Sequence, residues 1–80
     1  MRLIYSKTAI KSLNKLPKYK KKKIVIQISR LKHNPHIGKK LKGKHFGQYS
    51  LRIWPQRVIY EVSRSTIIIH KIQHRQGVYK

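Results

Sequence analysis

The apolar residues of this chain change their spacing once, near residue 35, and the change separates a helical part from a strand-rich part. Before it, apolar side chains recur every three or four residues, which predicts helices over Lys7–Leu16 and Lys18–His33. Ser6 offers an N-cap hydroxyl to the first helix, and Pro17 separates the two helices. The residues expected to face the core from these helices are Ile10, Leu13, Leu16, Ile24, Ile28 and Leu31.

Beyond this point the sequence is rich in β-branched residues and punctuated by glycine, a composition typical of strands. Strands are predicted over Tyr49–Trp54, Gln56–Val62 and Thr66–Gln73, with a further short strand at Arg2–Tyr5. Because tight links join the last three strands, we expect them to form an antiparallel meander. The sequence therefore predicts an α+β fold, in which an N-terminal helical hairpin packs on one face of a small twisted antiparallel sheet, as a single domain over residues 1–80.

Charge restricts the function more than any motif does. Lysine and arginine account for 21 of the 80 residues, whereas Glu61 is the single acidic residue, so the formal net charge is +20. A compact chain with this charge repels itself, and a polyanion or an acidic partner relieves that repulsion. One carboxylate excludes paired-acid glycoside hydrolysis and carboxylate-bound Mg²⁺ or Ca²⁺, and the lack of cysteine excludes thiolate metal sites and disulfides. We therefore expect neither a metal nor another cofactor.

Nothing in the sequence points to a membrane. The longest apolar runs, Ile24–Ile26 and Ile67–Ile69, are too short to cross a bilayer. The N-terminal segment has no apolar stretch followed by a small-residue cleavage site, so we expect no signal peptide. These features favour a cytoplasmic protein.

Alternation along the predicted strands places arginines on the sheet face that the helices leave uncovered. Arg52 and Arg57 are expected to meet there with Arg75 and Lys71, because apolar residues of the same strands fill the opposite face. Guanidinium groups from three neighbouring strands can bind a phosphate through planar, paired donors. The alternative is an ordinary solvated basic face, and the pattern alone does not decide between the two.

In the last strand, strict alternation places Ile67, Ile69, Lys71 and Gln73 on one face and Ile68, His70, Ile72 and His74 on the other. His70 lies between apolar neighbours and is therefore expected to be a packed core residue. Glu61 is expected to form an ion pair with Arg57, two residues away on the same face of its strand.

Several short motifs follow one another along the chain: Ser6-Lys7-x-Ala9, Leu16-Pro17, Asn34-Pro35, Lys40-Leu41-Lys42-Gly43, Tyr49-x-Leu51-Arg52-Ile53, Arg57-Val58-Ile59-Tyr60-Glu61-Val62 and His74-Arg75-x-x-Val78-Tyr79. Each motif is weak alone. Together, in this order and at these spacings, they cover nearly the whole chain, which resembles the RelE/ParE toxins of bacterial toxin–antitoxin pairs. The resemblance implies a helical hairpin on a small antiparallel sheet, in agreement with the fold predicted from periodicity.

The resemblance to the RelE branch implies a ribosome-dependent endoribonuclease, which cuts mRNA without a metal by attack of the 2′-hydroxyl and so inhibits translation. The implied partners are the ribosome, mRNA and an acidic cognate antitoxin. Carried over by position, the implied catalytic residues are Arg52, Arg57, Arg75 and Tyr79. Ser50 stands where some members of the family have a catalytic lysine.

Metal-free cleavage needs a base for the 2′-hydroxyl, positive charge near the phosphorus and an acid for the leaving oxygen. Arg57 and Arg75 are the candidates for the phosphate clamp, and Tyr79 can stack on a base or transfer a proton. His74 is a further catalytic candidate, because an imidazole gains or loses a proton close to neutral pH. The residues expected to hold RNA without taking part in the chemistry are Lys39, Lys40, Lys42, Lys44, Lys71 and Trp54.

Two other functions stay open on the sequence. The ParE branch has the same scaffold but inhibits DNA gyrase and is not an enzyme. A catalytically impaired relative would keep the charge and bind RNA without cutting it, an alternative supported by Ser50 at the lysine position. The arginines together with Tyr79 favour the ribonuclease.

Overall fold

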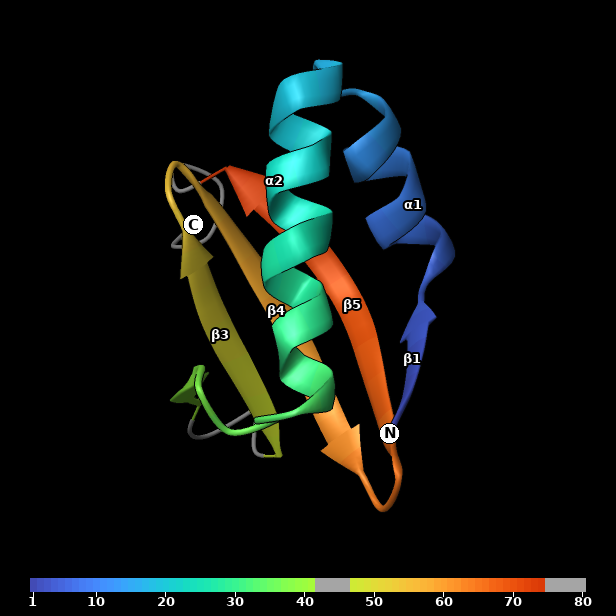
Figure 1. Ribbon diagram of the computed structural model, residues 1–80, viewed down its shortest axis with the longest axis vertical. Helices are drawn as coiled ribbons and strands as arrows, with labels where there is room; N and C mark the ends of the chain where they lie inside the picture. The colour runs from blue at the N-terminus through green and yellow to red at the C-terminus, as the bar shows by residue number, and fades with distance from the viewer. Residues whose placement is uncertain (42–46, 75–80) are drawn as a thin grey trace.

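The structure, a computed structural model, describes residues 1–41 and 47–74 and has two layers (Figure 1). Helices α1 (Lys7–Asn14) and α2 (Lys18–Ser29), the latter extended by a 3₁₀ turn, η1 (Arg30–Lys32), cover one face of a five-stranded sheet. The strands are β1 (Arg2–Tyr5), β2 (Lys39–Lys40), β3 (Gln48–Ile53), β4 (Gln56–Ser63) and β5 (Thr66–His74). The predicted α+β fold, a helical hairpin on one face of a small sheet, is confirmed.

The strands follow the order β1-β5-β4-β3-β2 across the sheet. β3, β4 and β5 form the predicted antiparallel meander, and β2 extends it at one edge. At the other edge β1 pairs with β5 in parallel, so the sheet is mixed and the expectation of a purely antiparallel sheet is wrong for this pair. Parallel strands need a long connection between them. The chain between β1 and β5 contains both helices, so this requirement is met.

The core lies between the helices and the sheet. Ile24, Ile28 and Leu31 on the α2 side are at most 2% exposed, which confirms the predicted apolar stripe. For α1 the prediction is partly wrong, because Ile10 is 45% exposed and Ala9, at 0%, is buried. The sheet contributes Ile53, Val58, Tyr60, Ile67, Ile69 and Ile72.

Ser6 fixes how α1 lies on the sheet. Its hydroxyl oxygen accepts a hydrogen bond from the Ala9 amide at 3.0 Å, as an N-cap does, and its O–H donates to the His70 carbonyl at 2.7 Å. The Ser6 amide donates to the Ile69 carbonyl at 2.9 Å. The first turn of α1 is therefore held against β5, and this orientation turns Ala9 inward.

β5 contains a β-bulge at His70, and the bulge changes which residues face the helices. Two consecutive residues of β4 lie opposite Ile69 and Lys71, so His70 is the additional residue. Ile69 and Ile72 are both buried although they are three positions apart, whereas Lys71 is exposed. The strict alternation expected for this strand is therefore wrong beyond Ile69, since one extra residue moves the following side chains to the other face.

Tyr60 connects the sheet to the segment that follows η1. Its side chain is 0% exposed, and its hydroxyl donates to the Pro35 carbonyl at 2.8 Å and accepts from the Gly38 amide at 3.0 Å. A Cβ atom at Gly38 would lie 2.6 Å from the Tyr60 hydroxyl oxygen and 2.9 Å from Cε1, so this approach requires glycine. The contact places β2 beside β3. Within residues 1–41 and 47–74, no helix is long and apolar enough to cross a membrane.

Candidate functional site

The face of the sheet opposite the helices, called the open face below, presents Arg52, Arg57, Ile59, Glu61, Lys71 and Gln73. Arg52 of β3 lies directly opposite Arg57 of β4, and Arg57 lies opposite Gln73 of β5. Directly opposed residues have Cβ atoms about 5 Å apart. The structure therefore brings together two of the arginines predicted to form the phosphate site. Arg52 is exposed and Arg57 is half-buried.

The pairing of two arginines across neighbouring strands favours an anion at this place. Like charges directly opposite each other destabilise a sheet unless a counter-charge lies between them. Guanidinium groups also offer planar pairs of N–H donors that match two oxygens of one phosphate. Arg52 and Arg57 can thus hold a phosphate group through several hydrogen bonds at once.

A second row of the open face runs across four strands, through Lys39, Ser50, Ile59 and Lys71. Lys39 and Lys71 are exposed at its two ends, whereas Ser50 is 8% exposed. Three strand spacings separate the two lysine positions by about 14 Å. Cations therefore lie on both sides of the two central strands, β3 and β4, a spacing suited to an extended polyanion. Lys40 lies opposite Tyr49, whose ring packs on the helix-covered face, so Lys40 does not belong to this row.

Glu61 and His70 form a pair that the sequence pattern did not predict. The Glu61 Oε1 and His70 Nε2 atoms are 3.1 Å apart, and the two side chains are 38% and 34% exposed. The expectation that His70 is a packed core residue is wrong, because the bulge turns this side chain toward Glu61. A bulge leaves no clear signal in hydropathy, so alternation could not have found the pair.

His74 and Trp54 lie at the end of the sheet where β3 turns into β4. His74 lies opposite Gln56 and follows Ile72 on the helix-covered side in the alternation, so it does not share the open face with Arg57. Trp54, which follows Ile53, is 54% exposed in the turn. The other predicted site residues, Lys42, Lys44, Arg75 and Tyr79, lie outside the described residues.

Two tyrosines in the core have perturbed acidities. Burial raises the pKa of Tyr5 and, more than its other contacts, that of Tyr60, because a buried phenolate loses its hydration. Neither phenol is therefore suited to transfer a proton at neutral pH. In the part of the chain that the structure describes, no three His, Cys, Asp or Glu side chains gather closely enough to hold a metal ion.

Known proteins resemble the chain over almost its whole length. Toxin RelE3 of Methanocaldococcus jannaschii is 29% identical over 85 residues, which cover 99% of this chain and 96% of that toxin. The fold matches the toxin–antitoxin complex RelBE2 of Mycobacterium tuberculosis with a TM-score of 0.83 and 27% identity, over 92% of this chain and 96% of the matched chain.

An archaeal RelE–RelB complex from Pyrococcus horikoshii OT3 matches with a TM-score of 0.81 and 28% identity, over 96% of this chain and 97% of the matched one. The profile of the family described as ParE toxin of type II toxin–antitoxin system, parDE, matches residues 3–79. That match spans both the helical hairpin and the meander with its opposed arginines. The chain therefore belongs to the ParE toxin family, within the RelE/ParE superfamily of type II toxin–antitoxin toxins.

Proposed function

We propose that this toxin is an endoribonuclease that cuts mRNA on the ribosome by attack of the RNA 2′-hydroxyl on the adjacent phosphorus. The observation that carries the proposal is the direct opposition of Arg52 and Arg57 on the open face. In this reaction the phosphorus passes through a state with additional negative charge on its oxygens, and fixed cations stabilise that state more than the ground state. Because the nucleophile is the 2′-hydroxyl, the reaction is limited to RNA.

The remaining roles follow the resemblance to the RelE branch. Arg75 adds to the phosphate clamp, and Tyr79 stacks on a base or transfers a proton. His70 with Glu61, on the same face as Arg57, is one candidate proton carrier. His74, which lies at the end of β5 on the helix-covered side, is the other. Cleavage rates of the His70→Ala and His74→Ala variants distinguish the two candidates, because loss of the proton carrier lowers the cleavage rate by about a hundredfold or more.

Purified toxin added to ribosomes programmed with a defined mRNA tests the activity. New 5′ ends are expected within the ribosome-bound mRNA, and Arg57→Ala is expected to slow their appearance by about a hundredfold or more. Arg30→Ala is the matched control. Arg30 is exposed where α2 meets η1, so this substitution removes the same charge at a place away from the open face. Intact mRNA, or full cleavage by the Arg57→Ala variant, would contradict the proposal.

A second candidate function follows from the matching family, whose description names ParE toxins. A toxin of that branch would inhibit DNA gyrase and leave mRNA intact. A supercoiling assay with purified gyrase, run beside the ribosome assay, separates the two. Inhibition of gyrase with uncut mRNA would replace the ribonuclease by this second function.

The proposed partner in both cases is an acidic antitoxin. Its support is the net charge of +20, together with the matched structures from M. tuberculosis and P. horikoshii, which are toxin–antitoxin complexes. An acidic segment laid across the open face would relieve the repulsion between the paired arginines and cover the phosphate site. Binding of this kind weakens as salt rises, because exposed charges are screened.

A further inference from the structure

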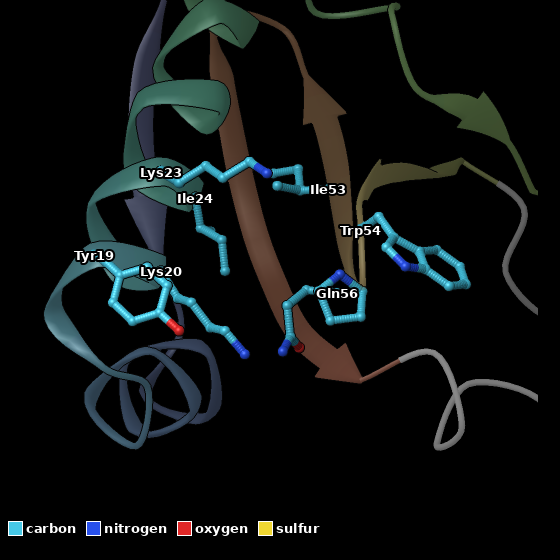
Figure 2. A pocket seen from close by; sticks show the side chains of 8 residues that line it. Tyr19, Lys20, Lys23, Ile24, Ile53, Trp54 and Gln56 are labelled. Atoms are coloured by element: carbon cyan, nitrogen blue, oxygen red, sulfur yellow. The ribbon is translucent and has the colours of Figure 1, made fainter.

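The structure contains a pocket of about 190 Å³ between α2 and the β3–β4 turn, on the side of the sheet that the helices cover (Figure 2). Ile24 and Ile53, 2% and 6% exposed, form its apolar part. Drug-sized ligands usually occupy about 300 Å³ or more, so this pocket suits one ring system and not a whole cofactor.

Polar and aromatic side chains surround this apolar part. Lys20 and Lys23 extend from α2 toward the β3–β4 turn, and the Gln56 side chain points into the space between them (Figure 2). Gln56 is 8% exposed, and its amide offers both a donor and an acceptor. Trp54 lies at the outer edge with its ring directed away from α2 (Figure 2).

The charge of the pocket selects an anionic ligand. Two of its lining residues are lysines and none is acidic, while the only acidic residue of the chain, Glu61, lies on the open face. The pocket thus combines an apolar part, an amide that can form hydrogen bonds and two positive charges. A planar ring with hydrogen-bonding edges and an attached negative charge matches all three. A nucleotide has this combination, with the base for the apolar part and the phosphate for the lysines.

The pocket lies one residue pair along the β3–β4 ladder from the opposed arginines, on the other face of the sheet. Trp54 directly follows the end of β3. The pair after Arg52 and Arg57 in the β3–β4 register is Ile53 with Gln56, which line the pocket. An RNA strand held by the arginines therefore reaches the pocket by passing around the turn at Trp54. An exposed tryptophan at such a point offers a surface on which a base can stack.

We propose that this pocket binds one unstacked nucleobase of single-stranded RNA, next to the phosphate held by Arg52 and Arg57. Lys20 and Lys23 bind the phosphates that flank this base, Gln56 contacts its edge and Trp54 stacks at the exit. The inference rests on the proposed function for the identity of the polymer, and it adds a binding site on the other side of the β3–β4 turn.

Trp54 is the only tryptophan of the chain, so its fluorescence reports on RNA bound at the β3–β4 turn, and the comparison with an abasic oligomer separates base binding in the pocket from phosphate binding at the arginines. The probe is a 2′-O-methyl oligoribonucleotide of about eight nucleotides, a length within the usual range of single-strand sites. Quenching of Trp54 is expected, with binding about tenfold tighter than that of an abasic oligomer of equal length and charge. Equal affinity of the two oligomers, or no change in fluorescence, would overturn the proposal.

Two double variants test the lysines. Lys20→Ala with Lys23→Ala is expected to lower the slope of log K against log salt by about 1.4, because two phosphate contacts are lost. Lys11→Ala with Lys15→Ala removes the same charge from exposed positions that do not line the pocket, and the slope should stay close to that of the parent. An equal reduction in both variants would show that the pocket lysines make no specific contact.

The probe cannot be cleaved, since its 2′-oxygens are methylated, so this experiment measures binding and leaves the reaction aside. Quenching by RNA without any cleavage of mRNA would support the pocket and contradict the proposed function. An oligoglutamate peptide of equal charge is the competitor. If it binds more tightly than the RNA and quenches Trp54 as well, the pocket binds an acidic protein segment and the RNA proposal is wrong.

Discussion

Replacing Tyr60 by phenylalanine removes a single oxygen atom from the interior of the molecule. That oxygen donates to the Pro35 carbonyl at 2.8 Å and accepts from the Gly38 amide at 3.0 Å. The ring itself is 0% exposed and stays in place in the variant, packed in the core. The substitution therefore isolates the two hydrogen bonds that hold the segment before β2 against the sheet.

The loss of stability expected for Tyr60→Phe follows from these two hydrogen bonds. Each contributes about 0.5–1.5 kcal/mol net, so their loss is expected to lower the free energy of unfolding by about 2 kcal/mol. Both partner residues are half-buried, so water can reach part of the site and the cost should not rise far above this value. For a domain of this size, a loss of that magnitude lowers Tm by about 8–16 °C.

Urea unfolding, followed by circular dichroism, measures the effect. The midpoint should fall while the slope m stays constant, because the surface exposed on unfolding is unchanged. Tyr19→Phe is the matched control, since it removes the same atom from a side chain that is 71% exposed, and its stability should change by less than about 0.5 kcal/mol. A Tyr60→Phe variant as stable as this control would refute the anchoring role of the hydroxyl.

Three further outcomes are expected. Ile28→Ala should lower the free energy of unfolding by about 2–5 kcal/mol in urea titrations, because Ile28 is 0% exposed, whereas Val25→Ala on the exposed side of α2 should cost far less. Burial raises the pKa of Tyr60 above its usual 10.0, so its contribution to stability is fully present below about pH 10 and is lost as the pH rises through the folded-state value. Thermal melts from about pH 8 to pH 11 should show this decline, and Tyr60→Phe should make it shallower. Glu61→Gln should change stability by less than about 1 kcal/mol at neutral pH, because its contact with His70 is half-exposed, and a larger loss in urea would indicate a network around that pair.

The sequence predicts the helices and the meander because their apolar spacing is regular. Ile24, Ile28 and Leu31 follow the helical period without interruption, and all three are buried. The parallel pairing of β1 with β5 could not be predicted in this way, since strand partners far apart in the chain leave no local pattern. The inward turn of Ala9 in place of Ile10 depends on the contacts of Ser6 with β5, which are also long-range.

In the candidate site, too, features that follow a regular local pattern could be predicted, and features that depend on an irregularity could not. Arg52 and Arg57 could be placed on one face because β3 and β4 pair residue for residue, without a bulge. The Glu61–His70 pair was missed because it depends on the extra residue in β5, whereas His74 lies on the same face as Ile72, as alternation predicted. Prediction from alternation therefore holds only where the ladder is regular, and nothing in the hydropathy of β5 marks where it stops being so.

The bulge in β5 has a consequence for how this strand tolerates substitution. Before residue 70 the odd-numbered residues Ile67 and Ile69 are buried, and after it the even-numbered Ile72 is buried. The buried residues therefore change from odd-numbered to even-numbered within one strand. Lys71 takes a position where a regular strand would need an apolar side chain. Deletion of His70 would restore a regular ladder and would keep Ile72 buried and Lys71 exposed, and point changes at the exposed Lys71 leave the core untouched. Because of the bulge, one nine-residue strand buries Ile67, Ile69 and Ile72 and still presents Lys71 on the open face.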